Sequence, residues 1–158
     1  MNFDLITEYL KVKPTISFAY IFGSVITPYY IPGKSDVDIG ILGDQEFTFY
    51  ELQEMAQDIS ELLPDHPEID LIDLMMDAPV LINQIIETGK PLFIKDDLIH
   101  DLFYCTQWSK YIDHVEWAKQ FDEDLKKGVI TNKSSIWYHP YSSEIENKII
   151  DEDTFNSM

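Results

Sequence analysis

The chain has 158 residues, of which 45% are hydrophobic, and its 29 acidic and 11 basic residues give a net charge of −18. This length and apolar content suffice for one domain with its own core. The charge argues against a nucleic-acid substrate, because proteins that bind nucleic acid need a basic surface to displace counterions. A basic protein partner is the natural electrostatic complement.

The composition also argues against a membrane or secreted protein. No apolar run reaches the length of a membrane span, and the N-terminus lacks the basic region of a signal segment. A single cysteine, Cys105, excludes an internal disulfide framework, so we expect a cytoplasmic protein. The four histidines show no metal-ligand spacing. All basic residues are lysines, so no guanidinium group is available to bind phosphates.

The first elements alternate helix and strand. Apolar residues at helical spacing predict a helix over residues 2–12, ended by Pro14. Residues 16–22 and 36–42 are predicted strands. The connection over 24–34 is rich in turn residues and leaves room for at most one helical turn.

The remaining elements continue this alternation. An amphipathic helix is predicted from Phe49 to Leu63, followed by a strand over 68–74. A helix opens at Pro79 and runs through Ile86, closed by Gly89. A short strand at 91–94 and a long helix over 97–127 complete the pattern, which indicates an α/β sheet packed by helices.

We expect one domain over residues 1–128 and an irregular extension over 129–158. The helical periodicity ends near Gly128, and no linker or repeat interrupts the residues before it. The extension ends in acidic residues and shows no regular period, which is typical of a segment that is irregular or ordered by a partner.

The pattern richest in chemistry spans the first two strands. Gly23 and Ser24 end one apolar run, and Asp36 and Asp38 open the next. Two residues apart on a strand, these aspartates share a face at about 7 Å, while Val37 points into the core. Of the three Asp-x-Asp matches in the chain, only this one follows a Gly-Ser strand end. The pattern predicts a place where Mg²⁺ and a nucleoside triphosphate bind together.

The strand over 68–74 carries two further aspartates. Asp70 and Asp73 are separated by an odd number of residues, so in a regular strand they face opposite sides. Their neighbours on either face are equally apolar, and hydrophobicity leaves both candidates open.

Together these motifs resemble the DNA polymerase beta-type nucleotidyltransferase fold over roughly residues 15–125. The short length and the stretch from Ile69 to Leu74, followed by Ala78-Pro79, Gly89 and Phe93, are similar to its minimal members. Those include the MntA-type antitoxins, which are encoded beside a HEPN-domain toxin. The resemblance implies a small mixed sheet packed by helices, with a long C-terminal helix.

The resemblance also implies roles for individual residues. Gly23 and Ser24 would cradle the β and γ phosphates, and Asp36 and Asp38 would hold two Mg²⁺ ions. The family pattern favours Asp70 over Asp73 as the residue that binds one metal and accepts the proton of the attacking hydroxyl. Asp36, Asp38 and Asp70 would therefore be both the catalytic residues and the metal ligands.

The chain departs from the family pattern just after Gly-Ser. Family members often carry a basic residue there, whereas this chain has Val25-Ile26-Thr27. Lys34 is the nearest cation and the candidate to touch phosphate in its place.

The function that the resemblance implies is transfer of AMP from ATP to a hydroxyl, a tyrosine of a cognate HEPN toxin. Two alternatives remain open. One is nucleotide transfer to a small molecule such as an aminoglycoside, although that class usually carries an added substrate domain. The other is a degenerate domain that neutralises a toxin by binding alone.

The long helix carries two apolar stripes. We expect the first stripe, Leu98, Leu102, Cys105 and Ile112, to face the core, because a surface helix needs one such stripe. The second stripe is Tyr104, Trp108, Tyr111 and Val115. It is either further core or an aromatic patch for a partner, because Tyr and Trp are enriched at interface hot spots.

Overall fold

The computed structural model describes residues 3–127. The chain divides into two compact units, Met1–Tyr111 and Ile112–Met158. No helix of the described residues is long and apolar enough to cross a membrane. The expected cytoplasmic location stays a prediction, as does the expected domain boundary at residue 128, and residues 129–158 lie outside the described residues.

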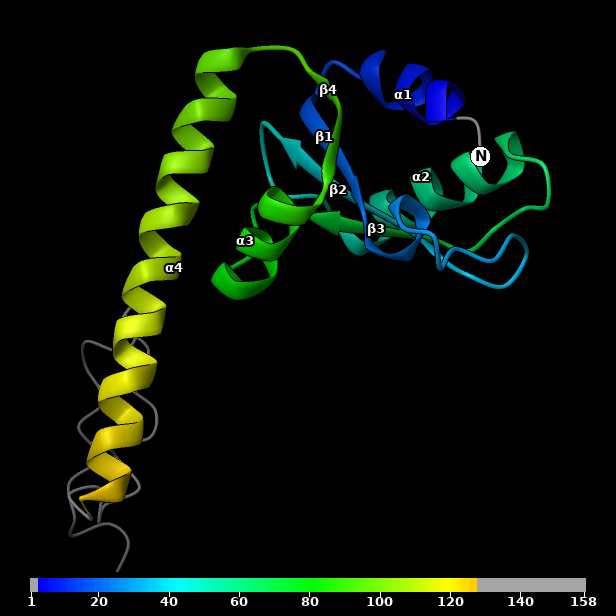
Figure 1. The fold of residues 1–158 in the computed structure, drawn as a ribbon. Helices are drawn as coiled ribbons and strands as arrows, with labels where there is room; N and C mark the ends of the chain where they lie inside the picture. The colour runs from blue at the N-terminus through cyan, green and yellow to red at the C-terminus, as the bar shows by residue number, and fades with distance from the viewer. Residues whose placement is uncertain (1–2, 128–158) are drawn as a thin grey trace, which may run out of the picture. The chain divides into compact units, whose positions relative to one another are not determined.

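The first unit is built on a four-stranded mixed sheet in the order β3-β2-β1-β4 (Figure 1). Its strands are β1 Ile16–Phe22, β2 Val37–Gly43, β3 Ile69–Asp73 and β4 Lys90–Ile94. β1 pairs antiparallel with β2 and β4, whereas β2 pairs parallel with β3. The predicted strands and the mixed sheet are confirmed. The ends of β2, β3 and β4 differ from the prediction by one residue, and β2 therefore begins after Asp36.

The predicted helices are also confirmed to within two residues at each end. They are α1 Phe3–Lys11, α2 Phe49–Leu62, α3 Pro79–Thr88 and α4 Asp97–Lys126. The connection after β1 holds one 3₁₀ turn, η1 Gly23–Ile26. Thr48 and Glu51 form a reciprocal capping box at the start of α2, which also lowers the pKa of the Glu51 carboxyl.

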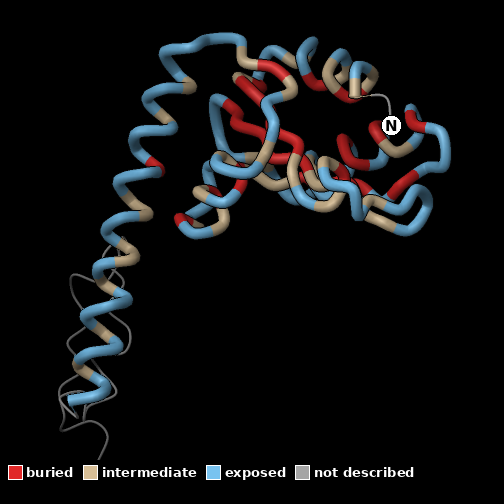
Figure 2. Tube along the Cα trace, in the orientation of Figure 1, coloured by how far each residue is buried: buried red, intermediate tan, exposed pale blue. Residues whose placement is uncertain are grey.

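Each face of the sheet has its own apolar cluster. α1 and α2 cover the face that carries Val37, Ile39 and Ile41 of β2. The opposite face carries Phe18, Tyr20 and Leu42, packed by residues of α3 and the start of α4. Buried residues, red in Figure 2, gather in the strands and on the inner sides of these helices. The alternation of side chains along β1 and β2 therefore supplies both layers of core.

The first turns of α4 dock onto β1 through an aromatic cluster. The Tyr20 hydroxyl lies 2.6 Å from His100 Nε2, and the ring of Phe103 meets the ring of Phe18 edge-on at 5.3 Å. Burial is the main cause that raises the pKa of the Tyr20 hydroxyl. This contact fixes which side of α4 faces the sheet.

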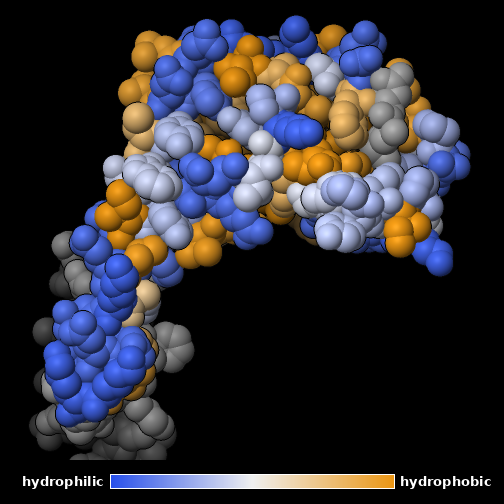
Figure 3. Space-filling model, in the orientation of Figure 1, coloured by the Kyte–Doolittle hydropathy of each residue, from blue (hydrophilic) through white to orange (hydrophobic). Residues whose placement is uncertain are grey.

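The core prediction for the first stripe was wrong. Leu98 and Leu102 are 67% and 59% exposed, and Cys105 and Ile112 are exposed as well. The reason is geometric, because a helix that turns His100 and Phe103 toward the sheet turns this stripe away from it. In the view of Figure 3, apolar atoms lie among hydrophilic ones along α4.

The second stripe is not core either. Trp108 is 42% exposed, and its ring lies 5.8 Å from that of the half-buried Tyr111. The Tyr104 hydroxyl donates a hydrogen bond to Glu87 Oε1 of α3 at 2.9 Å, which raises the pKa of Tyr104. The interpretation of this stripe as a partner surface stays a prediction.

From the second unit the structure describes only the end of α4. The rings of Trp117 and Phe121 stack there with centroids 5.4 Å apart. Lys127 pairs with Glu123 one turn earlier, an exposed contact that contributes little to stability.

Truncation of single side chains on α4 will show which face of the helix is structural. We expect Phe103→Ala to lower the free energy of unfolding by about 2 kcal/mol, because the half-buried ring packs on Phe18. The matched control Leu102→Ala removes an exposed side chain and should change it by less than about 0.5 kcal/mol. Urea denaturation of the two variants measures both values, and equal losses would contradict this docking geometry.

Candidate active site

Two of the three predicted aspartates lie side by side on neighbouring strands. Asp38 of β2 is the register partner of Asp70 of β3 in the parallel ladder. Residues paired in this way project their side chains to the same face of the sheet. This face is opposite to that of Val37 and Ile39, as the alternation predicts.

Asp36 is an exposed residue just before β2 rather than within the strand. Its charge still acts on Asp38, whose carboxyl pKa is raised from 3.8. Burial is the largest cause, followed by repulsion from Asp70 and then from Asp36. The three predicted carboxylates therefore form one electrostatic cluster centred on Asp38.

Asp73, unlike Asp70, has a structural role. Its carboxylate accepts hydrogen bonds from the backbone N–H of Phe47 at 2.8 Å and of Met75 at 2.9 Å. Asp73 therefore ties the loop before α2 to the end of β3, on the side of the strand opposite Asp70. Its lone pairs serve the backbone, which favours Asp70 as the chemically available acid.

Gly23 is required by its contact with Asp38. Its φ is +74°, and a Cβ built there would lie 2.1 Å from Asp38 Oδ2. Position 23 thus has a left-handed backbone conformation, and the Asp38 carboxylate occupies the space that a side chain would need. Gly33 has a similar φ of +73° but open space around its Cα. The sequence predicted a glycine for close approach of phosphate, whereas the observed neighbour is the Asp38 carboxylate.

The other predicted nucleotide-binding residues flank this cluster. Ser24 is half-buried, and its carbonyl accepts hydrogen bonds from the Thr27 N–H and hydroxyl at 3.0 and 2.7 Å. Lys34 is exposed and lines a cavity of about 240 Å³ together with Asp36. Ser35 has a structural role, since its hydroxyl accepts a hydrogen bond from the Ile31 N–H.

The carboxylates fit a cation that a substrate helps to hold. Among residues 3–127, no three His, Cys, Asp or Glu side chains converge closely enough to enclose a metal ion. Mg²⁺ is usually bound by one or two carboxylates together with substrate phosphates, so a full protein cage is not required. Mutual repulsion around Asp38 is the kind of electrostatic environment that a divalent cation relieves.

Sequence reasoning missed the surroundings of the start of β3. The turn before it places Asp65 and His66 at positive φ, 73° and 42°. Both line the cavity that also holds Lys34 and Asp36. The sequence analysis did not single these residues out, although aspartate and histidine are, with asparagine, the non-glycine residues enriched at positive φ.

The mixed sheet, the glycine turn and the facing aspartates of β2 and β3 define a class of nucleotide-transferring enzymes. The chain belongs to the family described as Polymerase beta, Nucleotidyltransferase, whose model matches residues 4–98. The resemblance stated from the sequence is thereby confirmed for the family. The search of curated proteins found no match.

Similar solved structures come from toxin–antitoxin complexes. A chain of a toxin–antitoxin complex with AMP-PNP shares 25% identity at a TM-score of 0.69, over 80% of this chain and 99% of that chain. A chain of the tri-AMPylated Shewanella oneidensis HEPN toxin in complex with MNT antitoxin shares 25% identity at a TM-score of 0.63, over 78% and 95%. A chain of a mutant MntA–HpeT complex shares 26% at 0.65, over 80% and 98%.

Asparagine substitutions will separate the roles of Asp70 and Asp73. We expect Asp73→Asn to lower the free energy of unfolding by about 1–2 kcal/mol, because one charged acceptor then becomes an amide between two backbone donors. Asp70→Asn should leave stability unchanged or slightly raised, because Asp70 repels Asp38. Thermal melts of both variants measure this, and a larger loss for Asp70→Asn would contradict the assignment.

The two left-handed glycines form a matched pair for a second prediction. Gly33→Ala should cost about 1 kcal/mol of stability, from backbone strain alone. Gly23→Ala carries the same strain and also collides with Asp38, so it should cost more and displace that carboxylate. Urea denaturation and nucleotide-analogue titration of both variants test this. Equal effects on nucleotide binding would mean that the contact with Asp38 is unimportant.

Proposed function

We propose that this chain is the antitoxin of a toxin–antitoxin pair and transfers AMP from ATP to a hydroxyl, a tyrosine, of a HEPN toxin. The observation that carries the proposal is the register pairing of Asp38 with Asp70 beside the Gly23 turn. Family membership supports nucleotidyl transfer. The neighbours with AMP-PNP and with a tri-AMPylated HEPN toxin support ATP and a protein acceptor.

Each carboxylate has a place in this reaction. Asp36, Asp38 and Asp70 would hold the Mg²⁺ ions that bind the triphosphate. The metal, when bound, offsets the negative charge of the phosphates and of the attacking oxygen. Asp70 is exposed on the same face as Asp38, so an incoming hydroxyl can reach it.

The transfer exchanges one bond at phosphorus for another. The hydroxyl oxygen forms a bond to the α phosphorus of ATP, and the bond from that phosphorus to the bridging oxygen breaks. Pyrophosphate leaves with the bonding electrons, and the hydroxyl proton passes to Asp70. Asp70 is suited to accept this proton because its carboxylate accepts no backbone hydrogen bond within the described residues. The carboxylate of Asp73, in contrast, accepts hydrogen bonds from the N–H groups of Phe47 and Met75.

The triphosphate meets little positive charge on this chain. Lys34 is the cation we assign to phosphate contact, since it lines the same cavity as Asp36. Gly23 and Ser24 form the turn against which the β and γ phosphates are placed. With no arginine in the chain, metal ions and the bound partner supply the remaining charge compensation.

Asp38→Asn tests the proposal directly. We expect it to reduce transfer of labelled AMP to a purified cognate HEPN toxin by at least about 100-fold, because a metal ligand is lost. EDTA should have the same effect on the unmodified chain. The control Asp44→Asn changes an exposed aspartate at the far end of β2 and should transfer normally. Full transfer by Asp38→Asn would remove the two-metal proposal.

The same variant has a stability signature that does not depend on activity. Because the folded-state pKa of Asp38 is raised, the folded chain binds more protons than the unfolded chain between 3.8 and the raised value. The contribution of Asp38 to the free energy of unfolding therefore falls as pH rises through that window. Asp38→Asn should be the more stable protein at neutral pH, with the difference vanishing below about pH 3.8. Thermal melts across pH measure this difference.

A further inference from the structure

β3 leaves one edge of the sheet unpaired in the described part of the chain. The order β3-β2-β1-β4 places β3 at an edge. The bonds from Val37 N–H to the Glu68 carbonyl and from Leu74 N–H to the Ile41 carbonyl show that even-numbered residues of this segment turn their backbone toward β2. The N–H and C=O groups of Ile69 and Leu71 therefore face outward from the sheet.

The two edges of the sheet differ in how they are protected. β4, the opposite edge, begins with exposed Lys90 and Pro91, and lysine and proline are the residues that block added strands. β3 contains neither residue type between Ile69 and Asp73. At its far end the loop bonded through Phe47 to Asp73 limits the open edge to the segment around Ile69 and Leu71.

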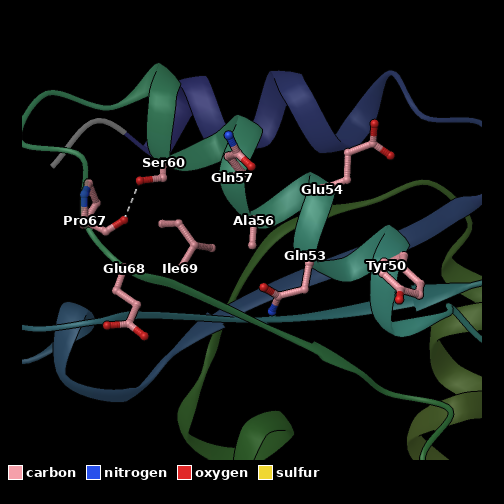
Figure 4. Close-up of a pocket in the computed structure, with 9 residues that line it drawn as sticks. All are labelled: Tyr50, Gln53, Glu54, Ala56, Gln57, Ser60, Pro67, Glu68 and Ile69. Carbon is pink, nitrogen blue, oxygen red and sulfur yellow. Dashed lines mark hydrogen bonds between the residues drawn. The ribbon is translucent and has the colours of Figure 1, made fainter.

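A groove follows this open edge. It has a volume of about 480 Å³ and lies between α2, which contributes Gln53, Glu54 and Gln57, and the chain from Pro67 to Ile69 (Figure 4). The Ser60 hydroxyl donates a hydrogen bond to the Pro67 carbonyl and so links α2 to the chain before β3.

The groove also leads toward the proposed active site. Pro67 and Glu68 line both it and the cavity that holds Lys34 and Asp36. The groove and the cavity thus meet just before β3, close in sequence to Asp70.

If an extended segment paired with β3, the face of the sheet on which each of its side chains lies would be fixed. Its backbone would lie about 4.8 Å from β3, and the residue opposite Asp70 would project to the face that carries Asp70 and Asp38. A hydroxyl on that residue would meet the proposed proton acceptor. The residues next to it along the segment would project to the opposite face, into the groove under α2.

The charges around the edge select the kind of segment. Glu54 and Glu68 line the groove, and Asp65 lines the smaller cavity that adjoins it. No lysine lines the groove itself. Lysine or arginine side chains on the added segment would pair with these acids.

We propose that the acceptor enters as an extended, basic segment of the partner protein, which pairs with the free edge of β3 and presents its hydroxyl residue opposite Asp70. This inference rests on the proposed function and adds how the acceptor is recognised. Main-chain hydrogen bonds provide the affinity, and the acids of the groove select basic sequences.

The test uses a short lysine-rich peptide with one central tyrosine as the probe. In the free chain the amide protons of Ile69 and Leu71 should exchange rapidly, and saturating peptide should slow them at least about 10-fold. N-methylation of alternate peptide residues on one edge should abolish this protection, whereas methylation of the other set should leave it unchanged. Exchange unaffected by the peptide, or equal tolerance of both methylated sets, would overturn the proposal.

Charge reversal in the groove provides a second measurement. Glu54→Lys, at a residue that lines the groove but not the cavity that holds Lys34, should weaken peptide binding at least about 10-fold, while Glu8→Lys, an exposed acid on α1, serves as the control. Titration with a non-hydrolysable ATP analogue and Mg²⁺ should be unchanged in all variants. If the analogue fails to bind the unmodified chain, the proposed function fails on its own. If the analogue binds while Glu54→Lys still binds peptide normally, the edge proposal fails instead.

Discussion

The parallel pairing of β2 with β3 is the constraint on which the rest of the site depends. One register sets Asp38 beside Asp70 on one face, and the same alternation sends Val37, Ile39, Ile69 and Leu71 into the core under α1 and α2. A slip of one residue would bury the aspartates and expose the core residues. The burial of these apolar side chains is therefore what fixes the carboxylates, so the fold and the site share one source of free energy.

The site is electrostatically unfavourable by itself. Asp38 is partly buried, repelled by Asp70 and Asp36, and pressed against Gly23, where no side chain could be accommodated. Such strain is common where a protein must bind a charged group that it does not itself contain. The described chain offers little compensation, since Lys34 is the one cation lining the adjoining cavity. Cations and a basic partner are the natural complements of a chain with a net charge of −18.

The surface differs in composition from one region to another. β4 carries a lysine and a proline at its exposed start, which discourages strand addition, whereas the edge of β3 next to the carboxylates lacks both. α4 is attached through His100 and Phe103, which leaves its apolar stripes on the outside. Exposed apolar side chains in rows of this kind are typical of protein contacts. The proposed protein acceptor would require such a surface in addition to a catalytic centre.

The sequence by itself determined the elements and most of the motif. Periodicity, Pro79, Gly89 and the Gly-Ser turn are local signals, and the helices and strands follow them closely. Local signals could not choose between Asp70 and Asp73, because both lie in equally apolar surroundings along the chain. The tertiary structure distinguishes their surroundings, since one of the two hydrogen bonds to Asp73 comes from Phe47, which is distant in sequence. The face of α4 that packs inward was likewise decided by Phe18 and Tyr20 across the sheet rather than by the apolar stripe of the helix. A sequence pattern records which residues share a face, whereas contacts with other elements decide which face is buried.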